Sequence, residues 1–116
     1  MIKQNYTNIP VMITENGCPD LMGEMAFNSN PLVDDHRIRY IKEHIEAVRF
    51  ALREGCNVIG YTVWSLMDNF EWDDGFEVRF GLFRVNFNSL KKNRTAKKSV
   101  EFYRQFIEKM KNSTIL

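Results

Sequence analysis

Two short apolar runs separated by one amphipathic segment restrict the folds open to this chain. Residues 9–14 and 57–64 are largely apolar, which is the pattern of strands covered on both faces in a parallel sheet. Between them, apolar residues recur every three or four positions up to about Glu54, with Asp34 as the expected N-cap and Gly55 as the stop. Strand, helix and strand in this order predict a parallel pair joined by a right-handed crossover.

The rest of the chain contributes loops, a β-rich run and a second helix. Residues 18–31 are rich in Pro, Asp, Asn and Gly and predict a long loop. Residues 79–87 alternate in polarity and predict a short strand or hairpin. From Ala96 to about Lys111, apolar residues share one helical face, so a helix is expected to follow the second strand and its loop.

Charge and cysteine content exclude several classes of function. Sixteen basic and fifteen acidic residues give no net attraction to nucleic acid or to an anionic membrane, so neither is expected as a partner. Cys18 and Cys56 show no metal-ligand spacing, so two unpaired thiols in or near the core, no metal and no cofactor are expected. No apolar run is long enough to span a bilayer, and the first residues are too polar for a signal peptide. Three Asn-x-Ser/Thr sequons, at Asn5, Asn93 and Asn112, nevertheless suggest a secreted parent.

A carboxylate stands where the first apolar run ends, in Glu15-Asn16-Gly17. In parallel α/β folds, active sites lie at the carboxyl ends of the strands. Two interpretations of Glu15 are therefore open on the local pattern alone. It is either a functional carboxylate or a loop carboxylate that accepts backbone hydrogen bonds.

The second apolar run leads into residues 64–75, which hold two indoles, an amide and four carboxylates. Sugars present an apolar face that stacks on aromatic rings and hydroxyls that carboxylates bind in pairs, so this mixture is typical of carbohydrate recognition. The alternative is that the aromatic residues belong to the core and the acids to a solvated loop.

Several longer motifs resemble those of glycoside hydrolase family 1, the β-glucosidase family, over nearly the whole chain. Residues 11–17, V-M-I-T-E-N-G, are similar to its I/V-T-E-N-G nucleophile motif, and residues 61–72 to its W-S-L-x-D-N-F-E-W segment. Residues 79–82 resemble the R-F-G-L that follows, and residues 97–99 the K-x-S before the last helix.

The resemblance implies an α/β fold, the carboxy-terminal part of a (β/α)8 TIM barrel. Residues 1–116 would form one incomplete domain, with the end of the sixth helix in residues 1–6 followed by the seventh and eighth β/α units. A complete barrel needs about 250 residues, so the remainder of the barrel is an expected partner. Without it, Met12, Thr14 and Val63 are expected to be unburied and the chain poorly soluble.

The resemblance also implies roles for five residues in hydrolysis of a β-glucoside with retention. Glu15 would be the nucleophile that forms a covalent glycosyl-enzyme. The sugar would be bound by the ring of Trp64 beneath it, the carboxylate of Glu71, the indole N–H of Trp72 and the side chain of Phe80. A carboxylate at 71 facing the 6-position would repel a phosphate, which predicts unphosphorylated glycosides.

The general acid/base of the family lies in an Asn-Glu-Pro motif that does not occur here. The segment alone is therefore expected to lack glycosidase activity. Two other functions stay open because the acid/base is outside the sequence: a binding protein that has lost catalysis, and a thioglucosidase in which the acid/base is replaced. A truncated gene product without a biochemical role is a third possibility. The aglycone and the sugar epimer are not specified.

Overall fold

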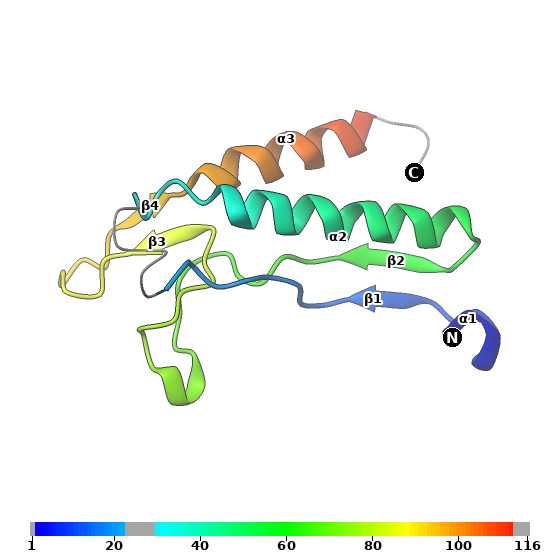
Figure 1. The fold of residues 1–116 in the computed structure, drawn as a ribbon, viewed down its shortest axis with the longest axis horizontal. Coiled ribbons are helices and arrows are strands. Elements are labelled where there is room, and N and C mark those ends of the chain that lie inside the picture. Colours follow the sequence, from blue (N-terminus) through cyan, green and yellow to red (C-terminus); the bar gives the residue numbers. More distant parts are fainter. Residues whose placement is uncertain (1, 23–29, 113–116) are drawn as a thin grey trace.

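The computed structural model describes residues 2–22 and 30–112, and its centre is a parallel pair of strands. A short helix, α1 (Ile2–Asn5), precedes strand β1 (Val11–Ile13), which pairs in parallel with β2 (Val58–Tyr61). Both arrows in Figure 1 point the same way, so the loops that follow these strands lie at one end of the molecule. The predicted parallel pair is confirmed.

Helix α2 (Asp35–Arg53) connects the two strands. Asp34 occupies the N-cap position as predicted, but its carboxylate makes no capping bond and instead contacts Arg37 and Ser99. Glu54 is the C-cap of this helix, and Gly55 follows it with φ of +76°, a conformation that glycine adopts without strain. Its predicted limits are therefore confirmed, whereas the expected function of the Asp34 side chain is wrong.

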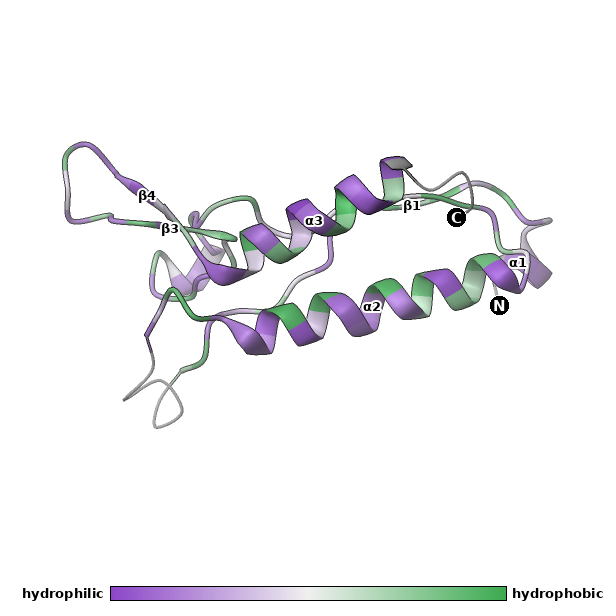
Figure 2. Cartoon of the chain, turned by 90° about the horizontal axis from the view of Figure 1, so that it is seen from above, coloured by the Kyte–Doolittle hydropathy of each residue, from purple (hydrophilic) through white to green (hydrophobic). Residues whose placement is uncertain are grey.

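Helix α3 (Lys98–Asn112) packs beside α2, and both helices cover one side of the strand pair (Figure 1). Both have mixed hydrophobic and hydrophilic surfaces (Figure 2), as expected for helices that bury one face. The core contains Ile41, Ile45, Val63 and Leu82. The expectation that Val63 is unburied is therefore wrong, because its side chain packs against the helices and is only 8% exposed.

An antiparallel hairpin lies beyond the end of β2. Strand β3 (Phe83–Val85) falls within the predicted β-rich run and pairs with β4 (Arg94–Ala96). Ala96 therefore belongs to a strand, and the last helix begins two residues later than predicted. The middle of the loop predicted over 18–31, residues 23–29, lies outside the described residues.

The strand pair is open on both sides. Within the described ranges, β1 and β2 have only each other as neighbours in their sheet. Met12 on β1 is 50% exposed and Thr14 is exposed, as the sequence predicts for the interior of an incomplete barrel. No helix in residues 2–22 or 30–112 combines the length and the apolar character needed to cross a membrane.

Candidate active site

A cavity of about 330 Å³ lies at the carboxyl ends of the two parallel strands. Its lining comes from the loop after β1, from helix α2 and from the loop after β2: Glu15, Asn16, Gly17, Tyr40, Trp64, Glu71 and Phe80. Four of the five residues predicted for the site are thus brought together. The fifth, Trp72, is not among the lining residues and is 82% exposed.

Asn16 fixes the backbone next to Glu15. The Tyr61 hydroxyl donates a 2.7 Å hydrogen bond to Asn16 Oδ1, and Asn16 Nδ2 donates to the Tyr40 hydroxyl at 3.4 Å. The Asn16 carbonyl accepts the backbone N–H of Trp64 at 2.9 Å. These bonds tie the exposed Glu15 to the second strand and to α2.

Burial raises the pKa of Tyr61 to about 12, and the neighbouring Tyr103 and Tyr40 add to the effect. Its hydroxyl therefore keeps its proton at neutral pH and remains the donor to Asn16. Burial also raises the pKa of Cys18, and both cysteines are free and partly buried. In residues 2–22 and 30–112, no group of three His, Cys, Asp or Glu side chains is arranged to hold a metal ion.

The segment after Trp64 runs beside the segment that carries Phe80. Ser65 donates its N–H to the Phe80 carbonyl at 3.2 Å, and Leu82 donates to the Ser65 carbonyl at 2.9 Å. The peptide bond between Trp64 and Ser65 is cis. This short ladder explains how two aromatic residues sixteen positions apart line the same cavity.

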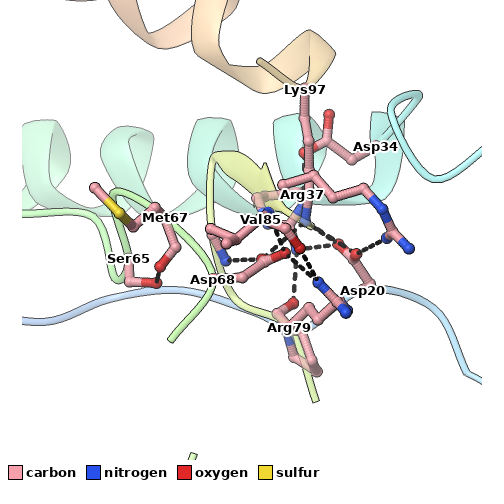
Figure 3. Close-up of polar contacts among 12 residues, drawn as sticks. Asp20, Asp34, Arg37, Ser65, Met67, Asp68, Arg79, Val85 and Lys97 are labelled. Carbon is pink, nitrogen blue, oxygen red and sulfur yellow. Dashed lines mark hydrogen bonds and ion pairs between the residues drawn. The ribbon is translucent and has the colours of Figure 1, made fainter. Parts of the chain in front are cut away.

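The Asp68 carboxylate links the loop after β2 to the segment that leads into the hairpin (Figure 3). Its residue is only 3% exposed, and its carboxylate accepts the N–H groups of Gly81 and Val85 at 3.0 and 3.1 Å. Arg79 donates to the same carboxylate at 2.8 Å. In the sequence Asp68 was only one of four acids in a mixed segment, because its burial depends on partners more than ten residues away.

A tight turn carries Glu71 and Trp72. Glu71 donates its N–H to the Gly75 carbonyl at 2.6 Å, and Trp72 has φ of 44° at the start of a 3₁₀ helix over Trp72–Asp74. The Phe76 ring lies between the rings of Phe70 and Phe87, with centroids 5.5 and 4.4 Å away. The turn therefore directs Glu71 into the cavity and leaves Trp72 outside it.

The cavity combines two carboxylates, an indole, a phenyl ring and an amide. A flat aromatic ring offers stacking area, and carboxylate oxygens accept hydrogen bonds in pairs. This set fits a small polyhydroxylated ring with one apolar face. The sequence did not single out Tyr40, because it lies within α2 and nothing in the helical pattern distinguishes it from its neighbours.

Comparison with known proteins identifies relatives over nearly the whole chain. The family model "Glycosyl hydrolase family 1" matches residues 1–112. The chain is 44% identical over 108 residues to a bifunctional β-D-glucosidase/β-D-fucosidase of Bifidobacterium breve, covering 91% of this chain and 23% of the relative. It is 44% identical over 110 residues to probable inactive β-glucosidase 14 of Oryza sativa subsp. japonica, covering 90% of this chain and 20% of the relative.

Among solved structures, the β-glucosidase of Thermotoga maritima in complex with cyclophellitol matches with a TM-score of 0.78 at 37% identity. The match covers 92% of this chain and 24% of that one. The chain thus spans about a fifth of the length of the curated relatives it matches.

Proposed function

Because the chain belongs to glycosyl hydrolase family 1 and is a segment of that family's (β/α)8 barrel, we propose that it supplies the nucleophile and part of the sugar site of a retaining β-glycosidase. The proposed segment is the carboxy-terminal part of the barrel, the seventh and eighth β/α units after the end of the sixth helix. The order β1, α2, β2, α3 supports two consecutive units.

The convergence of Glu15, Trp64, Glu71 and Phe80 on one cavity carries the proposal. In retaining hydrolysis, a carboxylate attacks the anomeric carbon and forms an ester, which water later cleaves. Glu15 is exposed at the mouth of the loop after β1 and is assigned this role. The acid/base carboxyl, which belongs about 5 Å from the nucleophile, is expected from the remainder of the barrel.

The other residues are assigned to the sugar. Trp64 supplies a ring for stacking, Phe80 lines the same space, and Glu71 accepts hydrogen bonds from two hydroxyls remote from the anomeric carbon. Trp72 keeps its role as an N–H donor only where the remainder of the barrel closes over its turn, since its ring is exposed in this segment. The proposed substrates are terminal, unphosphorylated β-D-glycosyl residues.

A chimera tests the nucleophile. Residues 1–112 replace the matching region of the T. maritima β-glucosidase, and an aryl β-glucoside reports turnover. A 2-deoxy-2-fluoro-glucoside should trap the glycosyl-enzyme, and peptide mass spectrometry should locate the sugar on Glu15. The variant E15Q should lose turnover and labelling, whereas E77Q, at an exposed acid outside the cavity, should retain both. Labelling of another residue, or an active E15Q variant, would refute the assignment.

One comparison favours a second candidate, a parent protein that binds sugars without hydrolysing them. A relative named probable inactive β-glucosidase 14 is as similar to this chain as the B. breve enzyme is. The parent protein itself separates the two functions. Turnover of an aryl β-glucoside by the full parent chain supports the hydrolase, whereas saturable sugar binding without turnover supports the binding protein.

A further inference from the structure

A buried lysine contacts both loops that carry the proposed site. Lys97 Nζ lies 2.7 and 2.9 Å from the two carboxylate oxygens of Asp20 and 3.4 Å from Asp68 Oδ1 (Figure 3). Asp20 lies five residues after Glu15, and Asp68 lies between Trp64 and Glu71. One ammonium group therefore spans the loop after β1 and the loop after β2.

The network around this lysine is balanced in charge. Three carboxylates (Asp20, Asp34 and Asp68) face three cations (Arg37, Arg79 and Lys97). Arg37 joins Asp20 to the start of α2, and Arg79 binds Asp68. Arg84, 3.9 Å from Asp20, lies at the exposed margin. Among the described side chains, Lys97 is the cation that contacts the carboxylates of both loops.

Fixed geometry is the clearest contribution that such a buried lysine can make. The Lys97 side chain is fully buried. The free-energy cost of removing its ammonium group and the two carboxylates from water opposes the attraction between them. A buried ion pair is therefore a weak source of net stability, and an apolar residue often serves as well. The three hydrogen bonds of Lys97, in contrast, hold the two loops together at Asp20 and Asp68. Two backbone bonds also join the loops: Asp20 N donates to the Arg79 carbonyl at 2.8 Å, and Trp64 N donates to the Asn16 carbonyl at 2.9 Å.

We propose that Lys97 is a positioning residue, which sets the spacing between Glu15 on one loop and Trp64 and Glu71 on the other. The inference rests on the proposed function of these residues. Misplacing reacting groups by about 1 Å costs roughly 100-fold in rate. Loss of the Lys97 contacts should therefore lower kcat/KM at each functional site by about tenfold to 100-fold, with most of the loss in kcat.

A purely structural role would give a different result. If Lys97 only supported folding, its loss would reduce the number of functional sites but leave kcat and KM per site unchanged. Active sites are therefore counted by burst titration with the fluorinated glucoside in the full-length chimera, and every rate is expressed per titrated site. This distinguishes a lower rate at each active site from a smaller number of active sites.

Three variants of the chimera test the proposal. K97M removes the ammonium group, and D20N/K97M removes it while leaving two carboxylates facing two cations, so no buried charge lacks its counterpart. The matched control is K98M, because Lys98 is the adjacent residue but has a 57% exposed side chain that pairs with Asp35. The double variant should keep a melting temperature near that of the parent and still lose at least about tenfold in kcat/KM per site. K98M should match the parent. A double variant with parental kinetics per site would overturn the proposal.

Crystal structures of the chimera and of D20N/K97M supply a test that does not require activity. The distance between the Cα atoms of Glu15 and Glu71 should differ by about 1 Å between them. An unchanged distance would overturn the positioning role even if activity fell. A folded parent chimera that neither turns over substrate nor labels Glu15 would instead overturn the proposed function, and the Cα distance would still decide whether Lys97 sets the spacing.

Discussion

Gly17 lies directly against the carbonyl group of Trp64. A Cβ atom on residue 17 would come within 1.7 Å of the Trp64 oxygen and 2.8 Å of its carbon. Both atoms belong to backbone, which cannot move aside as the tip of a flexible side chain can. Glycine is therefore required here for close approach of the two loops, and any larger residue must separate the loop after β1 from the loop after β2.

The first prediction follows from this contact. In the full-length chimera, G17A should reduce kcat/KM for an aryl β-glucoside by about 100-fold, because it displaces Glu15 from Trp64 by an ångström or more. Gly55 is the matched control: it follows α2 away from the cavity, its φ is +76°, and its missing Cβ would meet only the flexible end of the Lys3 side chain. G55A should cost only the strain of a left-handed residue, roughly 1–2 kcal/mol of stability. Equal kinetic losses in the two variants would contradict the packing argument.

Periodicity was sufficient to predict the elements that a strand or helix pattern specifies locally. Residues 9–14 and 57–64 contain the observed strands, and the helical pattern after Asp34 matches α2. The pairing of β3 with Arg94–Ala96 was missed because its stability comes from non-local hydrogen bonds between short segments. Val63 was placed on the wrong face because the sequence does not reveal which side of the sheet the helices cover.

The candidate site divides in the same way. Glu15, Trp64, Glu71 and Phe80 belong to long motifs that the sequence displays directly. In the sequence, Asp68 and Lys97 appeared only as positions within the motifs, without an assigned role. Their burial depends on tertiary partners, since a charged residue enters a core only with a counterion and hydrogen bonds that local sequence does not specify.

The second prediction concerns substrate charge. If Glu71 faces the 6-position of the sugar, it repels a 6-phosphate by about 4 kcal/mol per unit-charge pair at contact in an effective dielectric near 20. E71Q should therefore narrow the preference of the chimera for an aryl β-glucoside over its 6-phosphate by at least about tenfold in kcat/KM. E77Q, outside the cavity, should leave the ratio unchanged. A ratio that E71Q does not alter would place the carboxylate elsewhere on the sugar.

The third prediction concerns Tyr61 at alkaline pH. Its pKa is about 12 in the folded state and 10 as a free side chain, so the folded protein holds this proton more tightly than the unfolded chain. The stabilisation that results is complete below pH 10 and disappears as the pH rises through about 12. The difference in tyrosinate absorbance between the parent chimera and Y61F should therefore contain a step near pH 12. A step near pH 10, the value of a free tyrosine side chain, would contradict the burial of Tyr61.

The fourth prediction tests the bond that replaces the expected N-cap. Ser99 is fully buried, and it gives Asp34 one hydrogen bond from its hydroxyl at 2.6 Å and one from its N–H at 2.9 Å. S99A removes the hydroxyl bond to a buried carboxylate and should lower the free energy of unfolding by about 1.5–3 kcal/mol. S89A, in an exposed turn, should change it by less than about 0.5 kcal/mol. Chemical denaturation of the chimera measures both, and equal values would show that Arg37 and the backbone N–H of residue 99 satisfy Asp34 without the hydroxyl.

The last prediction uses the exposed sheet face to distinguish a segment from a self-sufficient domain. Met12 is 50% exposed and contacts the Gly60 position, on the face that a closed barrel turns inward. The isolated 116-residue chain should therefore self-associate through this face and the free strand edges, as measured by sedimentation. M12K should weaken that association, since a charge opposes burial between copies.

In the chimera, where the barrel encloses residue 12, the same substitution should cost about 3 kcal/mol or more of stability, because an unpaired ammonium is buried. L90K places an identical charge on a fully exposed residue and should have no effect in either protein. M12K should thus weaken self-association of the isolated chain but destabilise the chimera, because only in the chimera does the remainder of the barrel cover this face. An M12K chimera as stable as its parent would refute that arrangement.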